Sequence, residues 1–197
     1  EWASEIAEYI GTEKTALHIP SVKTDAVGAN GTKYVKAEKN ASIKDTVTYT
    51  NVLAGEYTVK GTLVDAETGK TVSTAEAKFK AEKANGTATV TFTADTSAAK
   101  GKTLVVYEDI YYGDTLVAQH KDAKDKAQSV TVVALSGNVY DAATKTKQIS
   151  MTEKAKATDE VTYEGLVKGE KYTLTGTVSD KETGKKKDVL NMEYFKA

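Results

Sequence analysis

The sequence contains no cysteine, one proline, one tryptophan and three phenylalanines among its 197 residues. The lack of cysteine excludes disulfides, thiolate catalysis and zinc–thiolate sites, so any covalent reinforcement needs other chemistry. An excess of one charge is also lacking: 27 Lys and Arg stand against 28 Asp and Glu, which argues against a nucleic-acid partner. No apolar run approaches membrane-spanning length, so no membrane insertion is expected, and no cofactor or metal is predicted.

The first twenty residues differ in pattern from the rest of the chain. The chain starts at Glu1 without a methionine or a secretory segment, and we expect it to be an internal piece of a longer protein. Ile6, Tyr9 and Ile10 recur at helical spacing before Pro20 closes the segment. Residues 1–20 are therefore predicted to be a leader or linker with one short helix.

From Val22 onward, short alternating runs of Thr, Val and Tyr are separated by turn residues. This pattern predicts an all-β fold, with short strands at the spacing of an immunoglobulin-like sandwich. Besides a first strand that begins near Val22, the predicted strands are residues 46–52, 56–66, 87–94, 102–112, 115–120 and 128–134.

An internal repeat indicates tandem modules. The run VTYTNVLAGEYTVKGTLVDAETGK at Val47 recurs at Val161, with one inserted lysine, as VTYEGLVKGEKYTLTGTVSDKETGK. The repeat has a period of about 115 residues. We expect a complete sandwich over residues 21–133 and the first half of a second, homologous sandwich over residues 134–197. Because half a sandwich leaves an open sheet edge, the natural chain is expected to continue beyond Ala197.

Three polar side chains fall on strand faces that are otherwise apolar. Strand alternation places Thr24 between Val22 and Ala26, Glu108 between Val106 and Ile110, and Gln128 with Val130. Buried polar groups need partners, so these three either are satisfied separately at strand ends or meet one another. A cluster around the last strand favours the second interpretation. It consists of His120, Asp125 and Gln128.

The residues of this cluster carry a resemblance to a known family. The runs VKTDA at 22–26, VVYED at 105–109 and HKDAKDKAQ at 120–128 resemble those of the intramolecular ester-bond domains, the Thr-Gln cross-linked immunoglobulin-like repeats of Gram-positive surface adhesins. Tyr107 stands where that family usually has phenylalanine. The resemblance implies a bond between Thr24 and Gln128. It also implies that Glu108, Asp125 and His120 assist its formation.

The implied reaction fits the chemistry of these groups. A carboxamide is a poor electrophile and a threonine hydroxyl a poor nucleophile, so both need proton transfer from a neighbour. Burial and a second carboxylate can keep one acid protonated, and Glu108 and Asp125 are predicted to be this coupled pair, with His120 tuning or relaying protons. The reaction occurs once per molecule, so the protein is not expected to be a turnover enzyme.

The resemblance further implies a structural stalk module, exposed on the cell surface and anchored to the cell wall. Its partners would be neighbouring repeats, while another domain would bind a host ligand. In the second module the threonine counterpart aligns with either Ser136 or Tyr140, and no cross-link is expected there. Three alternatives stay open: an isopeptide bond that uses Lys23 or a neighbouring lysine, a ligand-binding adhesin head, and a hydrolase that uses Glu108 and Asp125.

Overall fold

The structure is a computed structural model that describes residues 18–149, 155–191 and 195–196. The helix predicted within the first ten residues lies outside the described part of the chain. The described residues form strands, turns and loops only, which confirms the predicted all-β fold. Within them there is no helix long and apolar enough to cross a membrane. The chain divides into two compact units, Glu1–Val132 and Val133–Ala197.

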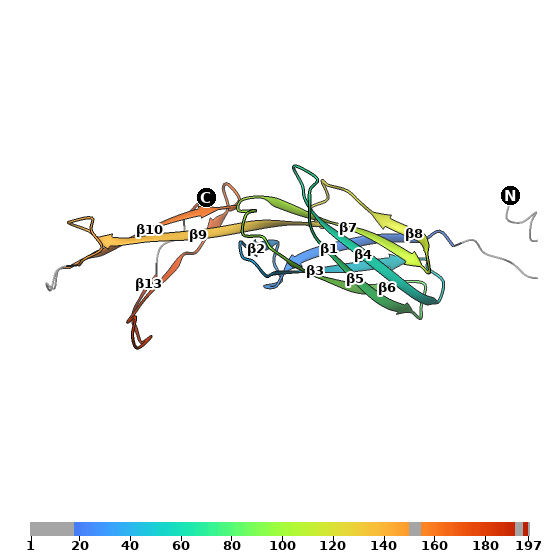
Figure 1. Cartoon of the computed structure of the whole chain (residues 1–197), viewed down its shortest axis with the longest axis horizontal. Helices are drawn as coiled ribbons and strands as arrows, with labels where there is room; N and C mark the ends of the chain where they lie inside the picture. Colours follow the sequence, from blue (N-terminus) through green and yellow to red (C-terminus); the bar gives the residue numbers. More distant parts are fainter. Residues whose placement is uncertain (1–17, 150–154, 192–194, 197) are drawn as a thin grey trace, which may run out of the picture. The chain divides into compact units, whose positions relative to one another are not determined.

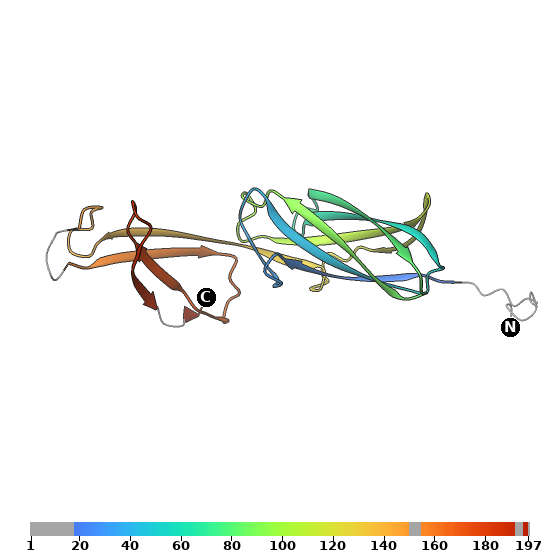
Figure 2. The same cartoon turned by 90° about the horizontal axis from the view of Figure 1, so that it is seen from below.

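The first unit is built from two antiparallel sheets (Figures 1 and 2). One sheet has the order β1-β3-β6, and the other has the order β9-β7-β4-β5, with β2 added on β9 and β8 on β7. The strands are β1 (Ser21–Gly28), β2 (Tyr34–Lys36), β3 (Ala41–Thr50), β4 (Gly55–Asp65), β5 (Thr71–Ala81), β6 (Gly86–Ala94), β7 (Thr103–Tyr112), β8 (Thr115–His120) and β9 (Ser129–Asp141).

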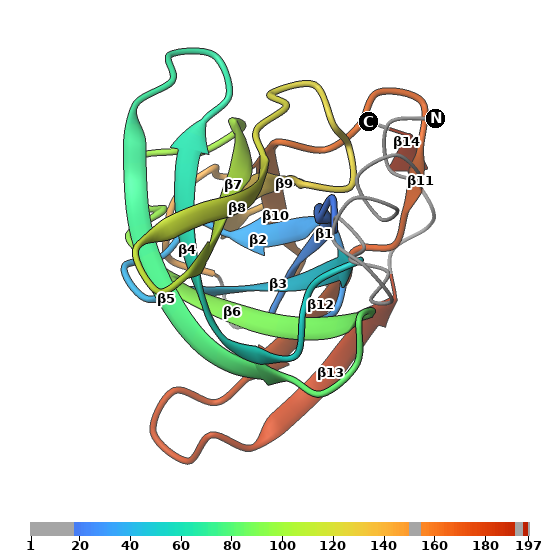
Figure 3. The same cartoon turned by 90° about the vertical axis from the view of Figure 1, so that its right-hand side faces the viewer.

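The two sheets face each other as layers of a sandwich. In the end-on view, β3 and β6 lie on one side and β7 and β8 on the other (Figure 3). The first strand of the unit, β1, therefore belongs to one sheet, whereas its last strand, β9, pairs with β7 in the other. A bond between the first and last strands would join the two layers.

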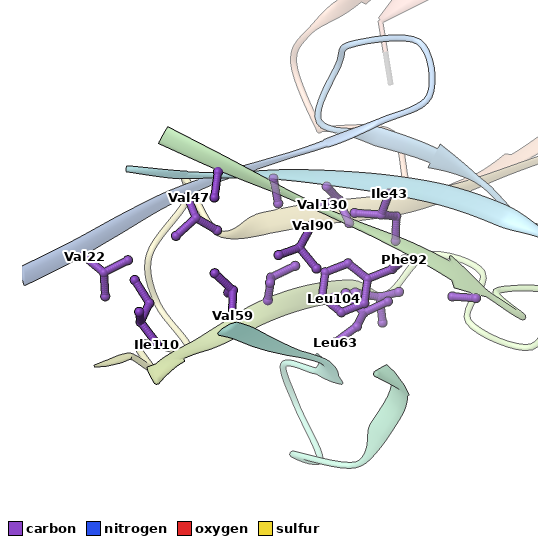
Figure 4. Close-up of a cluster of buried hydrophobic side chains, with 14 of the residues drawn as sticks. Val22, Ile43, Val47, Val59, Leu63, Val90, Phe92, Leu104, Ile110 and Val130 are labelled. Carbon is purple, nitrogen blue, oxygen red and sulfur yellow. The ribbon is translucent and has the colours of Figure 1, made fainter. Parts of the chain in front are cut away.

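The space between the layers is filled by apolar side chains, many of them valines (Figure 4). Ile43, Leu63, Phe92, Leu104 and Ile110 are all fully buried. Each lies at a position where strand alternation turns the side chain inward, which is why this Thr- and Val-rich sequence forms half-buried strands.

Two strands of the first unit, β5 and β2, were not predicted from the sequence. Strand β5 carries Thr, Lys and Glu outward and mostly small residues inward, with only Phe79 as a large inward side chain. Its apolar signal is weak for that reason. Strand β2 is only three residues long, too short to show any alternation.

The second unit holds the remaining strands, which pair locally. They are β10 (Ala157–Glu164), β11 (Lys171–Tyr172), β12 (Thr175–Ser179), β13 (Lys186–Asn191) and β14 (Phe195–Lys196). The last part of β9 pairs with β10, β11 pairs with β14, and β12 pairs with β13.

Equivalent turns in the two units have the same geometry. In the first unit the side chain of Asp65 accepts hydrogen bonds from the backbone N–H groups of Glu67 and Thr68, both at 3.0 Å. In the second unit Asp180 accepts the equivalent bonds, at 3.0 and 2.8 Å, two and three residues further on. The glycine that ends each turn has a positive φ, 69° and 67°. The repeated DxETGK motif therefore encodes a local turn.

Candidate functional site

Thr24 lies on the inner face of β1, and its side chain is 5% exposed. Its register partner on β3 is Val47, while the next residue inward on β3, Asp45, pairs with Ala26. Thr24 and Asp45 are thus diagonal neighbours on one face of the sheet. Among the described protein groups, the Thr24 hydroxyl has no hydrogen-bond partner. The Asp45 side chain is the group that interacts with this hydroxyl, although not in an ordinary hydrogen-bond geometry.

Gln128 lies at the entry to β9 and is fully buried. Its Nε2 donates to the backbone carbonyl of Val106 at 2.8 Å and to that of His120 at 3.2 Å. Its Oε1 accepts a long bond, 3.4 Å, from the backbone N–H of Asp122. Both ends of the carboxamide are therefore held by main-chain groups, which fixes the orientation of its carbonyl carbon.

The segments that carry Thr24 and Gln128 are directly hydrogen-bonded to each other. The backbone N–H of Ala26 donates to the carbonyl of Ala127 at 2.8 Å. Ala26 is on the same strand face as Thr24, and Ala127 immediately precedes Gln128. The structure thus places side by side the two segments that carry Thr24 and Gln128, the residues that the family resemblance placed at the ends of a cross-link.

Glu108 is fully buried in the middle of β7, opposite Gly61 on β4. A Cβ atom at position 61 would lie 2.8 Å from Glu108 Oε1 and 2.5 Å from Cζ of Phe92. The carboxyl group therefore occupies the space that any side chain at position 61 would need. Among the described protein groups, neither carboxyl oxygen of Glu108 has a hydrogen-bond partner.

The carboxyl group coupled to Glu108 is that of Asp45, so the predicted pairing with Asp125 is wrong. Asp45 is fully buried in the central strand β3, and it interacts with both Glu108 and Thr24. Sequence analysis missed it because the predicted strand began at residue 46, whereas β3 begins at Ala41 and includes Asp45. Alternation with Ile43 and Val47 would have placed Asp45 on the inner face.

Burial controls the protonation of this pair. Removal from water, followed by the neighbouring carboxyl of Asp45, raises the pKa of Glu108 to about 9. Burial also raises the pKa of Asp45, although the neighbouring Glu108 and Thr24 side chains oppose the shift. Glu108 therefore carries a proton at neutral pH. The two groups interact closely although neither forms a hydrogen bond of ordinary geometry.

His120 and Asp125 lie together at the edge of the site. His120 Nε2 is 3.4 Å from Asp125 Oδ2, and the two side chains are 24% and 28% exposed. The other oxygen of Asp125 accepts the backbone N–H of Ala127 at 2.8 Å, and the carbonyl of His120 accepts from Gln128. Both residues thus shape the segment that presents the carboxamide. His120 is also the register partner of Glu108 across β7 and β8.

In the second unit the residue at the register position of Thr24 is a glycine. Val161 pairs with Gly137 just as Val47 pairs with Thr24, so the alignment with Ser136 or Tyr140 is wrong. Asp159, the counterpart of Asp45, is retained, and a Cβ atom at position 137 would lie 2.9 Å from its Oδ1. The strand β9 of this unit therefore presents no hydroxyl at the reactive position.

Lys23, the candidate for an isopeptide bond, is exposed on the outer face of β1. Within the described residues, no group of three or more His, Asp or Glu side chains could hold a metal ion.

The T-Q ester bond containing domain family matches the chain twice, over residues 20–132 and 134–197. The chain therefore belongs to this family, as its resemblance to the ester-bond domains indicated. No curated protein matches the chain.

Solved structures resemble this chain only distantly. A bacterial adhesin from Mobiluncus mulieris containing intramolecular disulfide, isopeptide and ester bond cross-links is 15% identical, with 87% of this chain and 93% of that chain covered and a TM-score of 0.48. A glycosyl hydrolase family 2 member from Bacteroides cellulosilyticus is 11% identical, with 76% and 17% covered and a TM-score of 0.46. The family assignment depends on the sequence match alone.

The raised pKa of Glu108 predicts a pH-dependent stability. Because the folded state holds a proton that the unfolded state releases above pH 4.5, stability should fall as pH rises from about 5 to about 9, by up to about 1.4 kcal/mol per pH unit. In a Thr24→Val background, which cannot form an ester, Glu108→Gln should flatten this dependence. Urea unfolding at several pH values measures it, and an equally steep dependence in the Gln variant would contradict the assignment.

The contact between Gly61 and Glu108 predicts a steric requirement at position 61. Gly61→Ala should displace Glu108 or Phe92 and lower the free energy of unfolding by about 1–3 kcal/mol. Thr62→Ala, at the next residue on the opposite face, is the matched control and should cost less. Denaturant unfolding of both variants in the Thr24→Val background makes the comparison. Equal losses would show that position 61 has no special role.

Proposed function

We propose that the chain is part of the stalk of a bacterial cell-surface adhesin, and that its first unit closes an ester bond between Thr24 and Gln128 without an external enzyme. The observation that carries this proposal is the arrangement around Thr24. A buried hydroxyl that interacts with Asp45 and a carboxamide held by main-chain groups lie on adjoining segments, and Asp45 and Glu108 are both buried carboxyl groups. Membership of the T-Q ester bond containing domain family supports the same chemistry.

In the first step the Thr24 hydroxyl oxygen attacks the side-chain carbonyl carbon of Gln128. The hydroxyl proton passes to Asp45, the carboxylate that interacts with it. Negative charge develops on Oε1 of Gln128, toward which the backbone N–H of Asp122 points. A main-chain donor at this position stabilises the developing charge without reorganisation.

In the second step the bond between the carbonyl carbon and nitrogen breaks. Glu108 gives its proton to the departing nitrogen, which leaves as ammonia, and Asp45 then returns the hydroxyl proton to Glu108. The net products are one ester and one ammonia, and both carboxyl groups return to their starting state. His120 and Asp125 assist by keeping the segment that carries Gln128 in place. The reaction happens once per chain, so no turnover is involved.

Folding accounts for most of the acceleration of ester formation, because it places the reacting groups together. Two groups held in contact by a rigid scaffold react as if at a very high concentration, which compensates for a weak nucleophile and a weak electrophile. Only the folded unit buries Asp45 and Glu108 together, because they come from different sheets. The unfolded chain should therefore not cross-link.

The cross-link benefits the fold and the transmission of force. It closes a loop of about a hundred residues, and loop-closure entropy alone contributes on the order of 4–5 kcal/mol to stability. It also joins β1 to the entry of β9, so tension between the ends of the unit passes through a covalent bond. The hydrogen bonds between β1 and β3 then bear little of the load.

We also propose a cellular location and partners for the protein. The family and its two matches in tandem favour a wall-anchored, extracellular stalk of a Gram-positive bacterium. Its direct partners would be neighbouring repeats of the same chain, and a separate domain would bind the host ligand. The alternative of a hydrolase that uses Glu108 and Asp125 loses support because Glu108 is fully buried away from any substrate.

Single-molecule stretching of the first unit tests the stalk role. The wild-type unit should show no extension from residues between Thr24 and Gln128. Thr24→Val, which keeps the shape of the side chain and removes the nucleophile, should release about 350 Å of additional length on unfolding. Equal extension of the two proteins would exclude a covalent path for force through this unit.

A further inference from the structure

Lys33, which lies just before β2, uses its ammonium group in three short contacts. Its Nζ donates to the backbone carbonyls of Ala26 at 2.6 Å and Ala127 at 2.7 Å, and to Oδ1 of Asp25 at 2.8 Å. An ammonium group has three donors and no acceptor, so these contacts use all of them.

The two carbonyls belong to the two segments that the ester would join. Ala26 is on β1 with Thr24, and Ala127 directly precedes Gln128. On its other edge β1 is paired with β3, so the Ala26 carbonyl faces away from that ladder and depends on Lys33. The same two alanines share the backbone hydrogen bond at 2.8 Å. Lys33 therefore reinforces a single backbone bridge between the reacting segments.

Lys33 is itself fixed to the last strand through its main chain. Its carbonyl accepts a hydrogen bond from the backbone N–H of Thr131 at 2.7 Å, and β2, which follows it, pairs with β9. The ammonium group thus extends from a base tied to β9 toward β1. Movement of β1 away from β9 would break the contact to Ala26.

We infer that Lys33 is a positioning residue for ester formation, which holds the strand of the nucleophile Thr24 against the segment of the electrophile Gln128. This inference rests on the proposed cross-link. Lys33 touches neither reacting group, so it acts through the distance between them. A displacement of about 1 Å between reacting groups can slow a reaction by about a hundred-fold.

The positive charge of Lys33 also favours ester formation. Asp45 is influenced by Glu108 on β7, Thr24 and Asp25 on β1, and Lys33. Of these, Lys33 is the cation, and its charge lowers the pKa of Asp45, which favours the carboxylate needed to accept the hydroxyl proton. Asp25 has the opposite effect.

The test follows ammonia loss over time in the 197-residue chain made by cell-free synthesis, quenched in denaturant at intervals and weighed by mass spectrometry. Lys33→Met keeps the aliphatic stem and removes the three donors. It should close the ester about ten- to a hundred-fold more slowly than the wild type. Lys33→Arg, which restores the charge and some donors, should recover part of the rate.

Folding is measured separately so that a lower stability is not mistaken for slower chemistry. The same substitutions in the Thr24→Val background are followed by denaturant unfolding, and rates are compared only where the chain is fully folded, with sucrose added if Lys33→Met needs it. Asp25→Asn is the matched control. It removes the contact to a carboxylate that is 61% exposed and keeps both carbonyl contacts, so its rate should stay within about two-fold of wild type.

The outcomes separate the two proposals. If the wild type itself loses no ammonia, the proposed cross-link fails. If the wild type cross-links and folded Lys33→Met does so at the same rate, only the role of Lys33 is overturned. A Lys33→Met chain that cannot fold even in sucrose would show that Lys33 serves the fold, which also overturns the positioning role.

Discussion

The burial of two carboxyl groups between the sheets is the constraint on which the first unit depends. Asp45 and Glu108 come from opposite sheets and are both fully buried, where two negative charges would be very unfavourable. Retention of one proton resolves this conflict. It also creates a proton donor beside a carboxylate, which is the combination that an unreactive hydroxyl and carboxamide require. Gly61 provides the space for this arrangement.

Main-chain hydrogen bonds hold the reacting groups in place. The carboxamide of Gln128 is oriented by three main-chain groups, and the reacting segments are bridged by a main-chain bond that Lys33 supports. Such contacts depend on the strand register more than on the identity of the neighbouring side chains. This explains how a sandwich whose sequence is rich in small and polar residues can hold a reactive geometry.

Strand alternation was sufficient to predict the class of fold and the burial of Thr24, Glu108 and Gln128. It failed for Asp45 because the predicted strand began at residue 46 and so left out the first five residues of β3, among them the carboxyl group that interacts with Glu108. Asp125 was predicted in its place because the family resemblance gives it a role in forming the bond, whereas the interaction between two carboxyl groups depends on contact across the sheets. Strand β5 was missed because its inward positions are mostly small.

The second unit shows why register must come from structure. Sequence alignment left Ser136 and Tyr140 open as counterparts of Thr24, since short polar runs align almost equally well in several ways. Pairing with β10 selects Gly137 instead. The two family matches therefore share an aspartate at the same register position, Asp45 and Asp159, but only the first has a hydroxyl side chain at the position of Thr24.

The measurement that tests the account most directly is the intact mass of the purified chain, with tandem mass spectrometry of the peptides that carry Thr24 and Gln128. The account predicts a mass lower by one ammonia and a single cross-linked peptide that contains both residues, absent in Thr24→Val. A full-length mass with the two peptides separate would contradict it.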